Sequence, residues 1–305
     1  MSHVSGFVSI LGRPNAGKST LMNALVGSKV AIVANKPQTT RTTIQGVWTQ
    51  PDSQVVFLDT PGILKAETVF HRRMMQALHE ALDSRDLFLF VVDATRPHSP
   101  EDEDALSLLS RSETPVILLL NKVDAVADKA TLLPRIEALT KVREFEEVIP
   151  ISALTGEGLD TLRKAILARM PEGPAYFPED YLTDQPERFI VAETIREKIL
   201  ALTRQEVPHS VAVLVENWEE KGRLTHVDAA IHVERQGQKV IILGAGGAML
   251  KQIGTQARQE LEQLLDRRFY LALHVKVTPR WRENPAFLKE LDWRAMLGAE
   301  SAKDE

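Results

Sequence analysis

The stretch Gly-Arg-Pro-Asn-Ala-Gly-Lys-Ser occupies positions 12–19 and fits the pattern G-x-x-x-x-G-K-[ST]. It follows an apolar run at 7–11 that is typical of a buried strand, and it precedes a helical pattern at 18–27. In that setting the glycines let the loop curl, so that backbone N–H groups and the helix N-terminus surround phosphate oxygens. The stretch therefore predicts a P-loop that binds a nucleoside polyphosphate.

The phosphate-binding residues that this loop predicts are Gly12, Asn15, Ala16, Gly17, Lys18, Ser19 and Thr20. Lys18 would place its ammonium between the β- and γ-phosphates, and Ser19 would offer its hydroxyl to Mg²⁺.

Two later segments complete the predicted phosphate and Mg²⁺ site. Asp59 opens Asp-Thr-Pro-Gly at 59–62 and can hold a Mg²⁺-bound water, while Gly62 can bring its N–H to the γ-phosphate because it has no Cβ. In the polar loop at 37–42, Thr40 is the favoured further Mg²⁺ ligand, with Thr39 as the alternative. Because both loops contact the third phosphate, the segments at 35–43 and 60–70 are expected to act as a nucleotide switch.

The base is predicted from the segment Asn-Lys-Val-Asp at 121–124, which follows an apolar run at 116–120. Ionised Asp124 can accept two hydrogen bonds from the N1–H and 2-amino groups of guanine, a donor pair that adenine lacks. Lys122 would lay its methylene stem along the base, and Asn121 would tie the segment to the P-loop. Ser152 and Ala153 would present a backbone N–H to guanine O6, so the expected ligands are GTP and GDP.

Short apolar runs alternate with amphipathic stretches over the first part of the chain, which predicts an α/β fold with a mostly parallel sheet and helices on both faces. The predicted strands are 7–11, 55–58, 87–92, 116–120 and 148–151, and the predicted helices are 18–27, 68–83, 100–111, 131–143 and 158–170. The acids at 101–104 follow Pro100 and are expected to open a helix rather than bind a cation, since acids favour a helix N-terminus.

The composition sets limits on the function. The 305 residues include 44% apolar and 26% charged residues, which excludes a disordered chain, and they include no cysteine, which excludes disulfides and thiolate sites. The apolar runs are far shorter than the roughly 20 residues that a membrane helix needs, so we expect a soluble, cytoplasmic protein. The eight histidines, His71 and His79 among them, show no metal-binding spacing.

Prolines at 171, 174, 178 and 186 mark a change of organisation. We expect a nucleotide-binding domain over 1–172, a docked aromatic linker over 173–186 and a second domain over 187–305, including a C-terminal tail. The second domain has an α+β order: a helix near 187–204, strands near 209–217 and 225–234, a short helix near 238–243, a glycine turn, a longer helix and a strand near 269–277.

The glycine turn Gly244-Ala245-Gly246-Gly247 matches the G-x-x-G loop of a KH domain, which clamps about four nucleotides of single-stranded RNA. The surrounding segment 235–282 carries nine Lys or Arg against three acids, which favours an anionic partner. The predicted RNA-binding residues are Lys239, Gly244, Ala245, Gly246, Gly247, Lys251 and Arg258. Trp281 with Arg280 and Arg282 could stack on or pair with RNA, although a tryptophan that closes the domain core is the favoured interpretation.

Together these motifs resemble the Era family, ribosome-associated members of the translation-factor-related P-loop GTPases. The resemblance covers nearly the whole chain and rests on residues 12–20, Thr-Thr-Arg at 39–41, residues 59–62, residues 121–124, Pro-Glu-Asp-Tyr at 178–181 and Ile-Arg-Glu-Lys at 195–198. It implies a GTPase domain followed by a bacterial-type (type II) KH domain. It also implies binding to the 3′ end of 16S rRNA, assistance in maturation of the 30S subunit, and a monomer, while peripheral contact with the inner membrane stays open.

The resemblance implies slow GTP hydrolysis. Ras-like enzymes carry a water-positioning glutamine after Asp-x-x-Gly, whereas Ile63 stands there in this chain. The residues expected to act in hydrolysis are Lys18, Thr40, Asp59, Gly62 and Asn15. Asn15 would help to bind K⁺ beside the phosphates, or would simply cap the loop. The alternative function is an RNA-binding assembly module that uses GTP as a structural ligand with negligible turnover.

Overall fold

The computed structural model describes residues 3–62, 68–83, 85–97, 99–109, 112–204 and 207–293. The chain forms two compact units. Unit 1 comprises Met1–Val33, Pro37–Lys65 and Met74–Asp184, and unit 2 comprises Ala34–Lys36, Ala66–Arg73 and Gln185–Glu305. Two short segments on either side of the Asp-Thr-Pro-Gly stretch thus group with the C-terminal unit, a division that the sequence did not predict.

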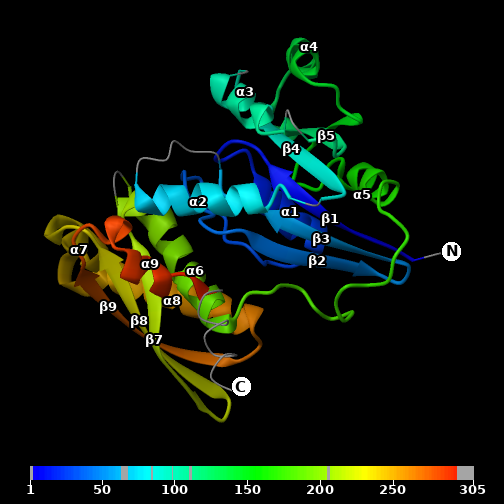
Figure 1. The fold of residues 1–305 in the computed structure, drawn as a ribbon. Coiled ribbons are helices and arrows are strands. Elements are labelled where there is room, and N and C mark those ends of the chain that lie inside the picture. Colours follow the sequence, from blue (N-terminus) through cyan, green and yellow to red (C-terminus); the bar gives the residue numbers. More distant parts are fainter. Residues whose placement is uncertain are drawn as a thin grey trace. The chain divides into compact units, whose positions relative to one another are not determined.

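Unit 1 contains a six-stranded sheet that is parallel except at one edge (Figure 1). In spatial order the strands are β2 (Ile44–Gln50), β3 (Ser53–Asp59), β1 (Val4–Leu11), β4 (Leu87–Asp93), β5 (Val116–Asn121) and β6 (Glu147–Ile151). The mostly parallel sheet is confirmed. The antiparallel edge strand β2 was missed, because its polar residues and Gly46 interrupt the apolar pattern of a strand that is covered less completely than its neighbours.

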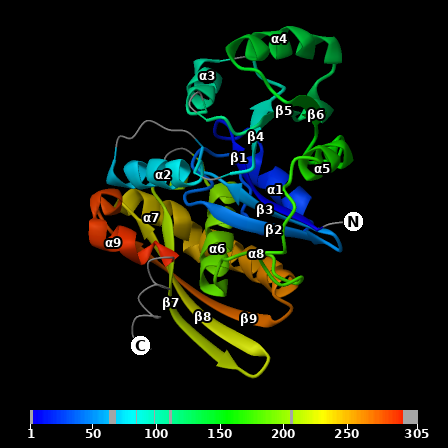
Figure 2. The ribbon, with the colours of Figure 1, turned by 45° about the vertical axis from the view of Figure 1, so that its right-hand side comes forward.

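Helices cover both faces of this sheet (Figure 2). They are α1 (Lys18–Val26), α2 (Val69–Glu80), α3 (Pro100–Ser107), α4 (Leu132–Val142) and α5 (Leu159–Leu167), with 3₁₀ turns at Val123–Ala125 and Lys129–Thr131. Leu78 of α2, Leu106 of α3 and Leu139 of α4 share one core with alternate residues of β4 and β5. Since every residue of β3, β4 and β5 is buried, these strands read as continuous apolar runs.

The acidic start of α3 is structural, as expected. Ser99 is the N-cap of this helix, its backbone N–H donates to Asp102, and Pro100 occupies the first turn. Glu101, Asp102 and Glu103 lie in that first turn, where the helix dipole favours negative charge. No helix in the described part of the chain is both long and apolar enough to cross a membrane.

The aromatic segment after α5 lies along the β2–β3 side of the sheet. The side chain of Gln54 accepts hydrogen bonds from the backbone N–H groups of Tyr176 and Phe177, and it donates to the carbonyl of Phe177. Farther along, the N–H of Val47 in β2 donates to the carbonyl of Leu182. This segment therefore covers part of the exposed edge of the sheet.

Unit 2 has the element order that the sequence predicted. Its main elements are α6 (Glu187–Leu202), β7 (Ala212–Lys221), β8 (Leu224–Val233), α7 (Gln236–Leu243), α8 (Ala248–Leu264), β9 (Arg268–Val277) and α9 (Pro285–Glu290), with 3₁₀ turns at Val207–His209, Ala245–Gly247 and Trp281–Glu283. In the sheet β7 pairs with β8 antiparallel and β8 with β9 parallel, and α6, α7 and α8 lie on one face (Figure 1). Ile195, Ile231, Ile253 and Leu261 lie in the core between them.

The hairpin of unit 2 is longer than predicted. Strands β7 and β8 meet at a tight turn in which Gly222 has a φ of +62°, whereas the sequence suggested a loop from 218 to 224. The exposed end of β7 is polar, so its residues give no alternation by which the strand could be recognised.

Candidate functional site

The P-loop connects β1 to α1 and needs glycine at two positions. Gly12 has a φ of +141°, and a Cβ there would lie 2.2 Å from the carbonyl oxygen of Val91. Gly17 has a φ of +98°, and a Cβ there would lie 2.2 Å from Nδ2 of Asn121. The loop can therefore pass close to β4 and β5 only without side chains at these positions.

Lys18 begins α1, and its ammonium lies inside the loop. Nζ donates to the carbonyl oxygens of Gly12 at 3.0 Å and Arg13 at 3.1 Å. Burial lowers the pKa of Lys18 from 10.5 to about 8, although the nearby carboxylate of Asp59 opposes this shift. An anion placed against the loop would raise this pKa again and so favour the charged form of Lys18, which suits a phosphate site.

A cluster of three oxygen-bearing side chains lies at the start of α1. Oγ of Ser19 donates to Oδ2 of Asp59 at 2.6 Å, and Oγ1 of Thr40 donates to the same oxygen at 3.0 Å. The Ser19 and Thr40 hydroxyl oxygens are 2.8 Å apart. The structure thus brings Thr40 into this cluster, in line with the sequence preference for Thr40 over Thr39.

Asp59 has the environment of a metal-binding carboxylate. It is fully buried, and its Oδ1 atom has no hydrogen-bond partner within the described residues. Burial raises the pKa of Asp59, while Lys18 and the hydroxyls of Ser19 and Thr40 oppose that shift. A carboxylate with a free oxygen and two hydroxyls matches the hard oxygen ligands of Mg²⁺, which leaves its other positions to water and substrate phosphates. The residues therefore fit Mg²⁺.

The chain after Asp59 packs against the P-loop. Oγ1 of Thr60 donates to the carbonyl of Ile10 at 2.8 Å, which fixes the segment to β1. A Cβ on Gly62 would lie 2.7 Å from Cγ and 2.8 Å from N of Pro14, so only glycine fits this position. Ile63, where the sequence lacks the Ras-like glutamine, lies outside the described residues.

The ends of β5 and β6 provide the predicted base site. Nδ2 of Asn121 donates to the carbonyl of Ala16 at 2.8 Å, so Asn121 does tie this segment to the P-loop. Nζ of Lys122 donates to the carbonyl of Asn15 at 2.7 Å. Asp124 is exposed, whereas Ser152 and Ala153 are buried.

One detail of the base site differs from the expectation. The N–H of Ala153 donates to Oδ1 of Asn121 at 2.9 Å, so it is already engaged and does not point freely toward a guanine O6. The sequence showed which loops meet but not this side-chain-to-backbone bond. Asn121 thus links the P-loop and the 152–153 segment at once.

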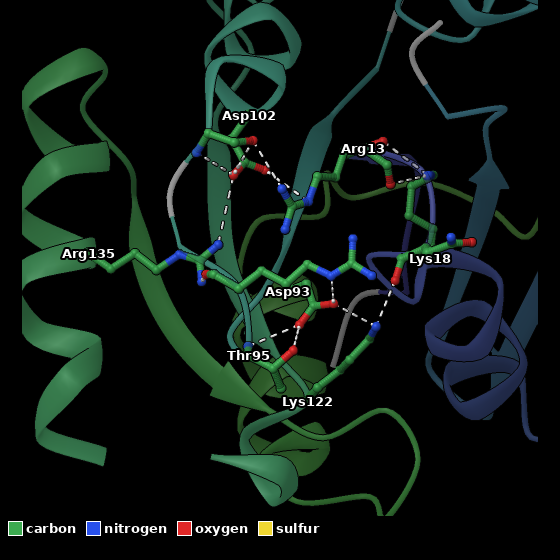
Figure 3. Close-up of polar contacts among 11 residues, drawn as sticks. Arg13, Lys18, Asp93, Thr95, Asp102, Lys122 and Arg135 are labelled. Atoms are coloured by element: carbon green, nitrogen blue, oxygen red, sulfur yellow. Dashed lines mark hydrogen bonds and ion pairs between the residues drawn. The ribbon is translucent and has the colours of Figure 1, made fainter. Parts of the chain in front are cut away.

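A polar network that the sequence did not predict joins the P-loop to the ends of β4 and β5 and to α3 and α4 (Figure 3). At the end of β4, Asp93 accepts from Lys122, while buried Asp102 of α3 faces Arg13 of the P-loop and Arg135 of α4. The position of Asp93 at the end of a parallel strand was a usable signal, because the other site residues also follow strand ends. From the sequence, Asp102 is expected only to open a helix, yet its carboxylate also faces two guanidinium groups.

The Gly244–Gly247 turn of unit 2 lies between α7 and α8, as predicted. Gly244, Gly246 and Gly247 have φ values of +70°, +55° and +83°. A Cβ on Gly244 would lie 2.7 Å from Cβ of Met249, whereas one on Gly246 or Gly247 would meet no described atom within 4 Å. A side chain would therefore collide at the first glycine of the turn, whereas there is space for one at the last two.

The surroundings of the turn are both basic and apolar. Lys251 in the first turn of α8 is exposed and Lys239 on α7 is partly exposed. Between them Val240 is 60% and Ile241 41% exposed, an apolar surface beside an open backbone turn. The Arg258 guanidinium, by contrast, lies 2.8 Å from Oε2 of Glu262, so this predicted RNA contact is engaged in an ion pair on its own helix.

Trp281 belongs to the core of unit 2, as the favoured interpretation held. It is fully buried, and its indole N–H donates to the carbonyl of Ser210 at 2.9 Å. Arg282 pairs with Glu234 at 2.6 Å. The alternative that Trp281 stacks on RNA is therefore wrong.

Comparisons with known proteins identify a GTPase family in the N-terminal part of the chain and a KH domain in the C-terminal part. A family described as "50S ribosome-binding GTPase" matches residues 7–122, and a KH domain family matches residues 206–282. The GTPase Era of Geotalea uraniireducens is 48% identical over 290 residues, which cover 95% of this chain and 97% of that protein. The GTPase Era of Lactobacillus delbrueckii subsp. bulgaricus is 49% identical over 293 residues, with coverages of 95% and 96%.

Two solved Era structures match across both units. A substituted Era from Aquifex aeolicus bound to GDP and AlF₄⁻ has a TM-score of 0.91, 41% identity and coverages of 95% of this chain and 99% of that one. An Era complex with MgGDPNP and nucleotides 1506–1542 of 16S ribosomal RNA has a TM-score of 0.92 with the same identity and coverages. Relatives close to half identical over nearly the full length of both chains show that this chain belongs to the Era family of GTPases.

Proposed function

We propose that this chain is a GTP-hydrolysing switch that binds single-stranded 16S rRNA at its 3′ end and assists maturation of the 30S subunit. The main support for GTP binding and hydrolysis is the cluster of Ser19, Thr40 and Asp59 next to the Lys18 ammonium. Support for the RNA half comes from the open Gly244–Gly247 turn and from the matching Era structure that holds 16S rRNA nucleotides 1506–1542.

The proposed roles of the residues follow the geometry. The loop from Gly12 to Thr20 would surround the phosphates with backbone N–H groups, and the Lys18 ammonium would exchange its two carbonyl partners for phosphate oxygens. Asp124 would select guanine, while Asn121, Lys122, Ser152 and Ala153 shape its site. Asn15 would help to hold K⁺.

Hydrolysis is proposed to rely on electrostatic stabilisation and positioning. Bound Mg²⁺ would neutralise charge on the phosphates, and Ser19, Thr40 and Asp59 are the residues that would hold it. Lys18 would stabilise the charge that develops on the transferred phosphoryl group. Gly62, which packs on Pro14, would bring its N–H toward the same group. With no glutamine after Gly62, we expect turnover to be slow.

Nucleotide state would control the order of the loops that carry Thr40 and Gly62. These residues lie in unit 1, while Ala34–Lys36 and Ala66–Arg73 group with unit 2. Loss of the third phosphate would release the contacts that hold both loops, so we propose that the RNA affinity of the chain depends on the bound nucleotide.

We also propose the domain division 1–172, 173–186 and 187–305, and a monomer in the cytoplasm that associates with the 30S subunit. Peripheral contact with the inner membrane rests on the family resemblance alone. Flotation of the purified chain with vesicles of anionic and neutral lipid tests that contact. Binding to neither vesicle would contradict it.

The hydrolytic activity is tested by single-turnover and steady-state release of phosphate from GTP, for the full chain and for Lys18→Ala. We expect slow turnover that requires Mg²⁺ and disappears in the variant. Lys129→Ala is the matched control, because Lys129 is exposed and its one ion pair with a described residue is to Glu157 at 2.7 Å. Tight GTP binding without any turnover would instead favour the alternative, in which GTP is a structural ligand of an RNA-binding module.

A further inference from the structure

We propose that Asp93 is a positioning residue of the nucleotide site. It holds the Lys122 side chain across the base-binding position and against the P-loop, and it thereby slows the release of guanine nucleotide. The inference rests on the proposed contact of Lys122 with the base, and the experiment below separates the two.

The Asp93 carboxylate is held in place by bonds other than the one to Lys122. Asp93 is the last residue of β4 and is only 2% exposed. Its Oδ1 atom accepts from the N–H of Thr95 at 3.0 Å and from Oγ1 of Thr95 at 2.6 Å. These two bonds close a tight turn after the strand, so that Oδ2 is directed toward the next strand end (Figure 3).

Lys122 is held at both of its ends. Its backbone has a φ of +70°, a left-handed conformation that is uncommon for a residue with a side chain. Its ammonium donates to Oδ2 of Asp93 at 2.7 Å and to the carbonyl of Asn15 at 2.7 Å. The methylene stem is thus stretched between the 121–124 segment and the P-loop, which gives a base a fixed apolar surface.

The groups around Asp93 keep its carboxylate ionised at neutral pH, which strengthens its hydrogen bond with the Lys122 ammonium. Burial alone would raise the pKa of Asp93, but the bonds from Lys122 and Thr95 outweigh it and hold the pKa below its usual value. Nε of Arg96 lies 3.7 Å from Oδ2, and Arg96 is largely exposed. A buried, ionised acceptor for an ammonium makes a stronger hydrogen bond than a neutral pair.

Without Asp93 the Lys122 ammonium would retain, within the described part of the chain, only its hydrogen bond to the Asn15 carbonyl. The lysine stem would then sample several rotamers, and a bound base would have to order it again. The loss of one charge-assisted bond of this kind corresponds to about a tenfold change in an equilibrium or a rate. We therefore expect faster release of nucleotide rather than loss of the fold.

The test measures release of a fluorescent GDP analogue from the full chain with Mg²⁺ present, for Asp93→Asn, Lys122→Met and the double variant. Methionine keeps an unbranched apolar stem without the ammonium. Asp93→Asn should release GDP about tenfold faster, Lys122→Met at least as fast, and the double variant within about twofold of Lys122→Met. Such non-additivity shows that Asp93 acts through the ammonium.

The control is Asp86→Asn. Asp86 directly precedes β4, at the end of the strand opposite Asp93, and accepts from the N–H of Phe7 at 2.7 Å, so it is a carboxylate away from the site. Its release rate should stay within about twofold of the wild type. Thr95→Val, which removes one donor to Asp93, should give a smaller acceleration, and it keeps the test open if Asp93→Asn does not fold.

The outcomes are distinguishable. Unchanged release in Lys122→Met would overturn the inference, because methionine keeps the apolar stem and loses the ammonium that Asp93 holds. Unchanged release in Lys122→Ala, which also loses the stem, would contradict the base contact of Lys122 itself. Faster release in Lys122→Met with unchanged release in Asp93→Asn would overturn the positioning role of Asp93 alone. Acceleration factors that multiply in the double variant would also overturn it, because Asp93 would then act independently of Lys122.

Discussion

Gln54 holds the linker against unit 1, and its substitution tests the docking of that segment. The side chain is fully buried in β3. Oε1 accepts from the N–H groups of Tyr176 at 2.7 Å and Phe177 at 2.9 Å. Nε2 donates to the carbonyl of Phe177 at 2.9 Å and to Oγ1 of Thr49 at 3.0 Å. Gln54→Leu keeps a similar volume and removes all four bonds.

The expected loss is about 3 kcal/mol. Three of the bonds join the linker, and each contributes roughly 1 kcal/mol net when the freed groups can return to water. The loss would be larger if the linker groups stayed buried without partners. Neighbouring contacts remain, since Oγ of Ser5 donates to the carbonyl of Pro174 at 2.7 Å and Val47 N–H donates to Leu182. We therefore expect local undocking near 176–177 rather than release of the whole segment.

Amide hydrogen exchange of Tyr176 and Phe177 measures this undocking directly, and urea unfolding followed by tryptophan fluorescence measures the stability. In Gln54→Leu both amides should exchange about a hundredfold faster, as roughly 3 kcal/mol requires. The matched control is Gln50→Leu, because Gln50 is exposed and its side chain donates, among the described residues, to the carbonyl of its neighbour Thr49 alone. Unchanged protection of the two amides in Gln54→Leu would refute the docking role.

Three further predictions concern the nucleotide site. Because burial lowers the pKa of Lys18 to about 8, the Lys18 side chain is mostly neutral at pH 8.5 without nucleotide, and binding of GDP should take up most of a proton at that pH but almost none at pH 7. Calorimetry in two buffers of different ionisation enthalpy measures this uptake, and equal uptake at both pH values would contradict the prediction. Gly17→Ala should weaken GDP binding more than tenfold, because its Cβ would displace the Asn121 side chain, and unaltered affinity in a fluorescence titration would count against this contact. Asp59→Asn should raise the Mg²⁺ concentration needed for tight GTP binding by about tenfold or more, and an unchanged requirement would argue against Mg²⁺ at this carboxylate.

Most of the fold follows from local sequence pattern. The buried strands β3, β4 and β5 were predictable because both of their faces pack against helices and every residue is apolar or fully enclosed. Edge strand β2 was not, because its Gln and Thr residues give no such run. The grouping of Ala34–Lys36 and Ala66–Arg73 with unit 2 depends on contacts between residues far apart in the sequence, which local pattern does not contain.

The site was predictable where backbone geometry dictates the residue. Gly12, Gly17 and Gly62 each lie where a Cβ would collide with backbone or a site side chain, so the motif records a steric requirement. The partners of Lys122 were not predictable, because Asp93 lies 29 positions earlier and only the parallel pairing of β4 and β5 brings the two together. The pairing of Arg258 with Glu262 in α8 was readable from the sequence, because opposite charges four positions apart on a helix lie side by side.

The central claim is that this guanine-nucleotide switch binds rRNA through the Gly244–Gly247 turn. The most direct test titrates the full chain, with a GTP analogue, against a short single-stranded RNA copying the 16S 3′ end and against a scrambled RNA at a stated salt concentration. The comparison variant carries Gly246→Asp and Gly247→Asp. A Cβ at either position meets no described atom within 4 Å, and Asp tolerates a positive φ, so the variant should fold.

We expect the chain to bind the 16S-derived RNA at least about tenfold more tightly than the scrambled RNA, and the aspartate variant to lose that preference through repulsion of the phosphates. Equal binding of both RNAs that disappears with added salt, or an aspartate variant that binds as tightly as the parent chain, would contradict the claim.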